Sequence, residues 1–208
     1  MVTSKYVLLF VTTLVPWACT HANSTALHEP VLPPLLVTSP GGNSIKLNEL
    51  WLERKATVLV FWSTGCPCVR RYQQRIDALL DMYPRDKVQV LGISSNAGES
   101  FEEVKRVAKE RGVRIEVFRD DSGQVAQTVG ARTTPTVVVI DQSGNIRFRG
   151  WIDNERLPGD PDREAYLDNA LRGVLEQRND FPTRSPMYGC AITRSLFRAP
   201  GCQCHQHQ

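Results

Sequence analysis

The sequence predicts an α/β protein in which a mixed β-sheet lies between two layers of helices, a three-layer α/β/α architecture. Short apolar runs rich in β-branched residues, at positions 57–62 and 88–93, have the composition of strands that are buried on both faces. Between such runs, apolar residues recur at three- and four-residue spacing, which is the period of a helix packed on one side. Near the end, a strand at 136–140 runs into a tight turn at 141–144, and this hairpin makes the sheet mixed.

The first half of the chain supplies an added hairpin and two strands of the sheet. A proline-rich stretch leads into the hairpin, which turns at residues 39–43. The strand at 57–62 runs directly into a helix over residues 66–83, which ends before Pro84. The strand at 88–93 follows this helix, as expected for a β-α-β unit.

In the second half, Ser100 and Glu103 form a capping box that opens a helix running to Gly112. The whole order is then β-α-β-α-β-α-β-β-α, which places helices on both faces of the sheet. The remaining elements are a strand at 113–117, a short helix ending at Gly130, the hairpin at 136–148 and a last helix over 166–175.

The composition fits one domain with appendages. The chain has 208 residues, of which 41% are hydrophobic and 23% charged, enough for a sizeable core. Its formal net charge of +3 is small and dispersed, which argues against a nucleic-acid partner. We expect a linker at 23–32, a domain at 33–178 that includes the hairpin extension, and an irregular tail at 179–208 that contains cysteine and histidine.

Residues 1–22 have the pattern of a targeting segment. Lys5 precedes an apolar run at 6–18, which is short for a membrane span and long enough for the core of a signal peptide. We expect cleavage after Ala22; lipidation at Cys19 or a retained anchor, which would attach the chain to the membrane, are the alternatives. Each of them predicts export to the periplasm or to the periplasmic face of the inner membrane, where paired cysteines usually form disulfides.

The chemistry is expected at the junction of the first core strand and its helix. With Cys66 as N-cap residue, Pro67 takes the first helical position, where its missing N–H costs nothing. Cys68 then lies in the first turn. Unpaired backbone N–H groups and the positive helix end, followed by Arg70 and Arg71, should favour the thiolate of Cys66 and make it a nucleophile.

Two separated motifs resemble those of the thioredoxin fold. Residues 61–66 (FWSTGC) look like the active-site approach of exported, TlpA-like thioredoxins, and residues 134–141 (TPTVVVID) look like their cis-proline strand. The resemblance covers about residues 33–177, and AhpC/TSA-type redoxins, which share the fold, are the closest competing group. It implies thiol–disulfide or peroxide chemistry at Cys66, with Pro135 beside the sulfur.

The motif also departs from both groups. Thioredoxins place two residues between their cysteines, whereas Pro67 alone separates them here. Ser63 fits the hydroxyl position of the peroxiredoxin signature, but Leu59 stands where that signature has proline. The nearest candidate for the activating arginine of peroxiredoxins is Arg132. Ser63 and Arg132, together with Arg70, are therefore candidate activating residues.

Two cysteines compete as the partner of Cys66. A bond to Cys68 would be strained by the rigid proline between them, and such a bond is easily reduced. Cys190 lies in a small apolar island late in the chain and resembles the late Gly-Cys of some redoxins, so it could resolve Cys66. It could equally pair with Cys202 or Cys204, or stay free.

The last residues form a short cluster of metal-ligating types. Cys202, Cys204, His205 and His207 offer soft and borderline ligands that suit Cu(I) or Zn(II). The spacing differs from that of a standard zinc finger, and adventitious binding or no binding is the alternative.

Three functions follow from these patterns. The first is an exported thiol–disulfide oxidoreductase, which acts on protein disulfides, depends on an unidentified electron-donor protein and requires no cofactor. The second is a thiol peroxidase, in which Cys66 is oxidised to a sulfenic acid and Cys190 resolves it. The third is a non-enzymatic Cu(I)-binding protein that uses Cys66, Cys68 and the terminal cluster.

Overall fold

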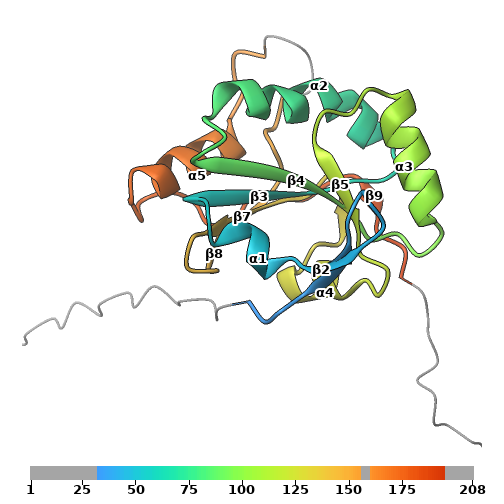
Figure 1. Ribbon diagram of the computed structural model, residues 1–208. Helices are drawn as coiled ribbons and strands as arrows, with labels where there is room; N and C mark the ends of the chain where they lie inside the picture. Colours follow the sequence, from blue (N-terminus) through green and yellow to red (C-terminus); the bar gives the residue numbers. More distant parts are fainter. Residues whose placement is uncertain (1–31, 156–159, 195–208) are drawn as a thin grey trace, which may run out of the picture.

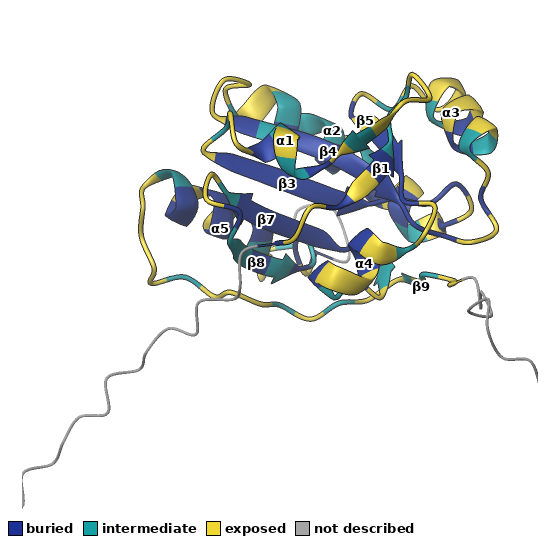
Figure 2. Cartoon of the chain, turned by 60° about the horizontal axis from the view of Figure 1, so that its bottom comes forward, coloured by how far each residue is buried: buried dark blue, intermediate teal, exposed yellow. Residues whose placement is uncertain are grey.

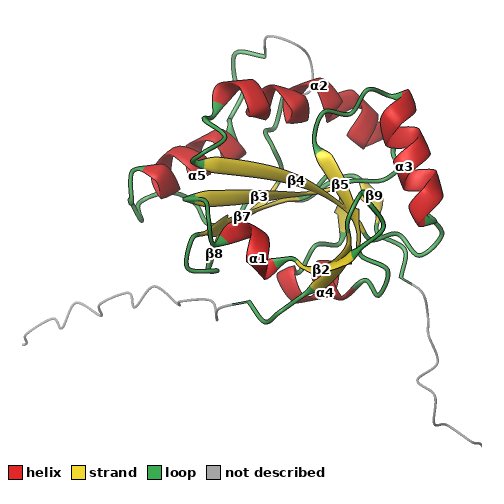
Figure 3. Cartoon of the chain, viewed as in Figure 1, coloured by secondary structure: helices red, strands yellow, loops and turns green. Residues whose placement is uncertain are grey.

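The computed structural model describes residues 32–155 and 160–194, and it has the predicted three layers (Figures 1 and 3). A seven-stranded sheet forms the middle layer in the order β2-β1-β5-β4-β3-β7-β8. Its strands are β1 (Leu36–Thr38), β2 (Ser44–Lys46), β3 (Ala56–Phe61), β4 (Val88–Ser94), β5 (Glu116–Arg119), β7 (Val137–Asp141) and β8 (Ile146–Gly150). The helices are α1 (Asn48–Trp51), α2 (Pro67–Met82), α3 (Phe101–Glu110), α4 (Gln124–Val129) and α5 (Tyr166–Leu175).

The sheet is mixed around its central strand. β3 runs parallel to β4 on one side and antiparallel to β7 on the other, and β7 continues into the antiparallel β8. All six residues of β3 are buried, as predicted for a strand covered on both faces (Figure 2).

Alternate residues of β3 face two separate apolar clusters. Val58 and Val60 belong to the cluster that includes the apolar faces of α2, α3 and α5. Leu59 and Phe61 belong to the opposite cluster, which includes residues of α1 and α4. Because side chains alternate along a strand, one continuous apolar run stabilises both layers.

Several predicted elements differ from the structure at their ends. The strand predicted at 113–117 is β5 and begins only at Glu116, so Val113 and Ile115 precede it, although Ile115 is buried.

The predicted capping box forms in part. Ser100 caps α3 by accepting a hydrogen bond from the Glu103 N–H at 3.1 Å. The Glu103 carboxylate instead accepts a bond from the Thr64 hydroxyl at 3.2 Å, so only half of the capping box forms.

A short second sheet, absent from the sequence predictions, joins the segment after α5 to the middle of the domain. β6 (Thr133–Thr134) pairs antiparallel with β9 (Cys190–Ala191), and the register places Thr134 opposite Cys190. Residues 179–194, predicted as an irregular tail, therefore contribute a strand against the domain.

The predicted targeting segment at 1–22, most of the 23–32 linker and the terminal cluster at 202–207 lie outside the described residues. Within the part of the chain that the structure describes, no helix is both long and apolar enough to span a membrane.

Candidate active site

The candidate active site is built around the N-terminus of α2. Cys66 is the N-cap residue, with extended backbone angles of φ −80° and ψ 115°, and Pro67 occupies the first helical position. This is the arrangement that the sequence predicts. The Cys66 side chain is only 1% exposed and belongs to the core cluster on the α2 face.

The loop before β7 forms one wall around the sulfur. The Thr134–Pro135 peptide bond is cis, in agreement with the resemblance to a cis-proline strand, and Pro135 is buried. The Thr134 carbonyl oxygen lies 3.2 Å from the Cys66 sulfur and accepts a hydrogen bond from it when Cys66 is protonated.

β9 lies beside this loop and places Cys190 near the sulfur. Cys190 pairs with Thr134 across the two-stranded sheet, and the Ile192 N–H donates to the Arg132 carbonyl at 2.9 Å. Further along, the Ala97 N–H donates to the Thr193 carbonyl at 2.9 Å. These backbone bonds fix Cys190 beside the helix N-terminus.

Gly189 makes this close approach feasible. Its φ of +122° is a conformation that side chains disfavour, and a Cβ atom added there would lie 2.1 Å from the Thr134 carbonyl oxygen. Only glycine fits between Tyr188 and Cys190 without moving β9 away from β6.

The folded chain brings three thiols together. The Sγ atoms of Cys66 and Cys190 lie 2.7 Å apart, and the Cys68 sulfur lies within 4.8 Å of both. A disulfide bond is about 2.05 Å long, so Cys66 and Cys190 need little movement to form one. Cys68 and Cys190 are both partly exposed, whereas Cys66 is buried beneath them.

The two closest thiols have opposite electrostatic environments. Burial raises the pKa of Cys66, but hydrogen bonds from the Cys190 thiol, the Thr134 side chain and the Val69 and Cys190 backbone outweigh burial and leave this pKa lowered. The hydrogen bond to Cys66, followed by burial, raises the pKa of Cys190 to about 11. Cys66 is therefore favoured as the thiolate and Cys190 as the thiol that donates to it.

Arginine is not the main cause of the lowered pKa of Cys66, in contrast to the sequence-based expectation. Arg70 is exposed, and its backbone N–H donates to the Cys66 carbonyl at 3.2 Å. The Arg71 guanidinium donates to the Glu155 carbonyl at 3.1 Å. The backbone at the N-terminus of α2 and the Cys190 thiol stabilise the Cys66 thiolate, a role that the sequence analysis assigned partly to the two arginines.

The other predicted activating residues lie away from the sulfur or are engaged elsewhere. The Ser63 hydroxyl donates to the buried Glu99 carboxylate at 2.6 Å. Arg132 is exposed and contributes its backbone carbonyl to the contact with Ile192.

Glu99 is a site residue that the sequence analysis missed. Its carboxylate, in a side chain 9% exposed, accepts bonds from the Thr64 N–H at 2.9 Å and from the Ser94 hydroxyl at 2.7 Å, besides that from Ser63. It thus ties the approach to Cys66 to the end of β4. An acid in a Ser- and Asn-rich loop after a buried strand was the available signal.

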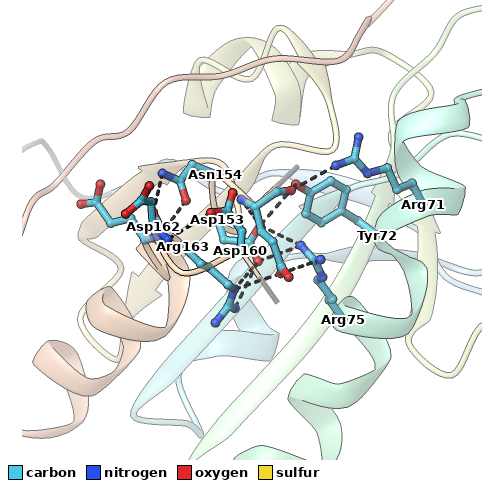
Figure 4. Close-up of polar contacts among 10 residues, drawn as sticks. Arg71, Tyr72, Arg75, Asp153, Asn154, Asp160, Asp162 and Arg163 are labelled. Carbon is cyan, nitrogen blue, oxygen red and sulfur yellow. Dashed lines mark hydrogen bonds and ion pairs between the residues drawn. The ribbon is translucent and has the colours of Figure 1, made fainter. Parts of the chain in front are cut away.

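A second buried carboxylate, Asp153, holds α2 in place (Figure 4). Arg75 and Arg163 point toward Asp153, with N–O distances of 2.8 and 3.1 Å, and the Tyr72 hydroxyl donates to the same carboxylate at 3.2 Å. The Tyr72 ring also packs against the Trp151 ring at a tilt of 34°, with ring centroids 5.4 Å apart. The helix that presents Cys66 is therefore anchored by ion pairs as well as by its apolar face.

A three-layer fold with a cysteine at the N-terminus of α2 and a cis-proline loop against its sulfur defines a thioredoxin-like redoxin. The model of the AhpC/TSA family matches residues 31–149, more than half of the chain. The protein belongs to the AhpC/TSA family.

Similar proteins agree with this assignment. The thiol-disulfide oxidoreductase ResA of Halalkalibacterium halodurans is 30% identical over 105 residues, which are 50% of this chain and 57% of that protein. The chain spans less than two thirds of the length of each curated relative that it matches.

Solved structures resemble the chain over most of its length. A hypothetical protein from Sinorhizobium meliloti aligns with a TM-score of 0.71 and 26% identity, covering 84% of this chain and 97% of that one. A putative thioredoxin from Neisseria meningitidis, at 23% identity, aligns with a TM-score of 0.55 over 70% of this chain and 90% of its own. The second likeness supports the thioredoxin-like fold.

Proposed function

We propose that this protein is an exported thiol–disulfide oxidoreductase in which Cys66 is the nucleophile and Cys190 is the resolving cysteine. The observation that carries the proposal is the pair of sulfurs 2.7 Å apart, with the pKa of Cys66 lowered and that of Cys190 raised. A thiolate beside a protonated thiol suits thiol–disulfide exchange, because the thiolate attacks the substrate first and the thiol reacts only in the second step. The name of the ResA relatives is consistent with this activity.

The reaction proceeds in two exchanges that transfer two electrons. The Cys66 thiolate attacks one sulfur of a substrate disulfide, and the other substrate sulfur leaves as a thiolate that takes a proton. Cys190 then loses its proton and attacks the Cys66 sulfur of the mixed disulfide. The second substrate thiol is released, and the enzyme is left with a Cys66–Cys190 disulfide.

Two further parts of the proposal come from the sequence. Residues 1–22 support export, and an oxidising compartment makes a separate electron-donor protein necessary to reduce the Cys66–Cys190 bond after each turnover.

The loop of Thr134 and Pro135, which borders the sulfur, would contact the substrate chain once β9 moves aside.

Disulfide mapping and insulin reduction in matched single variants test these roles. Cys66→Ser should abolish reduction, whereas Cys190→Ser should accumulate a mixed disulfide between Cys66 and substrate. Cys68→Ser is the matched control and should keep most of the activity. Mapping that finds a Cys66–Cys68 bond and a free Cys190 in the oxidised protein would assign the resolving role to Cys68 instead.

A thiol peroxidase draws less support from the site. The Ser63 hydroxyl donates to Glu99 instead of the Cys66 sulfur, and Arg132 is exposed. Peroxide consumption by the reduced protein, at a rate above that of a free thiol and lost in Cys66→Ser, would favour the peroxidase.

A further inference from the structure

We propose that the reduced protein binds one Cu(I) ion through the sulfurs of Cys66, Cys68 and Cys190. The three sulfurs lie within 4.8 Å of one another, and this group of the described residues contains no histidine or carboxylate. The site goes beyond the redox role because it assigns a ligand position to Cys68, which the two exchange steps do not use. It also differs from the predicted use of the terminal cluster at 202–207.

The donor set favours Cu(I) over harder or more highly coordinated ions. Thiolates are soft ligands that select Cu(I), Zn(II) and iron–sulfur clusters. Zn(II) in structural sites takes four ligands in a tetrahedron, whereas this group offers three sulfurs. Cu(I) is stable with two or three thiolates, so the group satisfies it without a further protein ligand.

The fold holds the three ligands in place before any ion arrives. Cys66 and Cys68 are fixed by the first turn of α2, and Cys190 is fixed by the pairing of β9 with β6. The Val69 and Cys190 N–H groups hydrogen-bond the Cys66 sulfur, and the positive end of α2 favours the added negative charge of the thiolates. The partial exposure of Cys68 and Cys190 leaves a route from solvent to the sulfurs.

Binding is a ligand exchange without electron transfer. Each thiol that binds the ion releases its proton to the buffer, and the copper stays Cu(I) throughout. Oxidation to the Cys66–Cys190 disulfide consumes two of the three ligands, so the site exists only in the reduced protein. Copper loading and disulfide exchange therefore exclude each other on the same chain.

The test is a competition for Cu(I) between the reduced full-length chain and the coloured chelator bathocuproine disulfonate, without oxygen. The parent protein carries Cys202→Ser and Cys204→Ser, which removes the thiols of the terminal cluster. We expect one Cu(I) per chain in this parent and none after its oxidation. Cys68→Ser and Cys190→Ser, each added to it, should weaken binding by at least about 10-fold, since changes around metal ligands already cost that much.

X-ray absorption of the copper-loaded parent gives a second measurement, in which we expect three sulfur neighbours and two in the Cys68→Ser variant. A Cys68→Ser variant with unchanged thermal unfolding and unchanged Cu(I) affinity would overturn the proposal. So would loss of all Cu(I) binding in the parent. Insulin reduction by Cys68→Ser separates the two proposals, because this variant keeps Cys66 and Cys190 but lacks the third ligand.

Discussion

The lowered pKa of Cys66 depends on a single neighbouring thiol more than on any charged side chain. Burial alone would raise the pKa of this sulfur, and the hydrogen bond from Cys190 is the largest of the effects that lower it. Reactivity at Cys66 is therefore coupled to the position of a residue 124 positions away in the sequence.

Removing the donor should raise the pKa of Cys66. In Cys190→Ala the burial remains but the strongest hydrogen bond is lost, so the pH at which alkylation of Cys66 is half-maximal should move upward. Peptide mass spectrometry of protein treated with iodoacetamide across a pH series measures this midpoint pH. Cys190→Ser retains a hydroxyl donor and should shift less; equal midpoints in all three proteins would contradict the assigned cause.

Glu99 is the residue whose loss should be costliest among the polar groups of the site. Glu99→Ala leaves the buried Ser63, Thr64 and Ser94 donors without their shared acceptor. Since a hydrogen bond to a charged group contributes about 1.5–3 kcal/mol, we expect the free energy of unfolding to fall by about 2–4 kcal/mol. Urea denaturation measures the change, and a loss below about 0.5 kcal/mol, the usual range of a surface substitution, would contradict it.

At the scale of elements, β9 determines where Cys190 lies, although it has only two residues. Its pairing with β6 places Cys190 opposite Thr134 and completes the enclosure of the Cys66 sulfur. The contact depends on Gly189, whose backbone passes directly over the Thr134 carbonyl.

Gly189→Ala should detach this strand. The added Cβ cannot coexist with the Thr134 oxygen 2.1 Å away, and a positive φ costs an alanine about 1–2 kcal/mol. We expect the Cys66–Cys190 disulfide to form more slowly on oxidation. Alkylation of the remaining free thiols in samples quenched at successive times measures this rate. Gly98→Ala is the matched control, because nothing lies within 4 Å of a Cβ there. Equal oxidation rates in the two variants would show that β9 tolerates the side chain.

The sequence predicted the elements well where local pattern decides them. The apolar run of β3 and the three- and four-residue spacing in α2 located Cys66 at a helix N-terminus, and the structure agrees. The pairing of Cys190 with Thr134 could not be predicted, since a two-residue strand has no measurable period and joins distant segments. Glu99 was missed for a similar reason, because its partners come from separate loops.

At the scale of the whole molecule, the proposed disulfide would close a very long loop. Cys66 and Cys190 are 124 positions apart, so the bond would connect α2 to the segment that follows α5. The chain-entropy model assigns about 4.7 kcal/mol to a loop of 100 residues, through the restriction of the unfolded chain. The redox state should therefore change the stability of the entire domain.

We expect the oxidised protein to exceed the reduced protein in free energy of unfolding by about 2–5 kcal/mol. Urea denaturation with and without reductant measures the difference. Cys190→Ser should unfold at the same urea concentration in both conditions. Equal stability of oxidised and reduced wild-type protein would indicate that this bond does not form.

The attachment of β9 has a further, kinetic consequence. A thiol tethered beside Cys66 acts at a high effective concentration, which is of millimolar order even for a flexible tether. Any external thiol that attacks a mixed disulfide at Cys66 competes with this internal one. Mixed disulfides with outside partners should therefore be brief, and the lifetime of each would be set by how long its partner holds β9 away from β6.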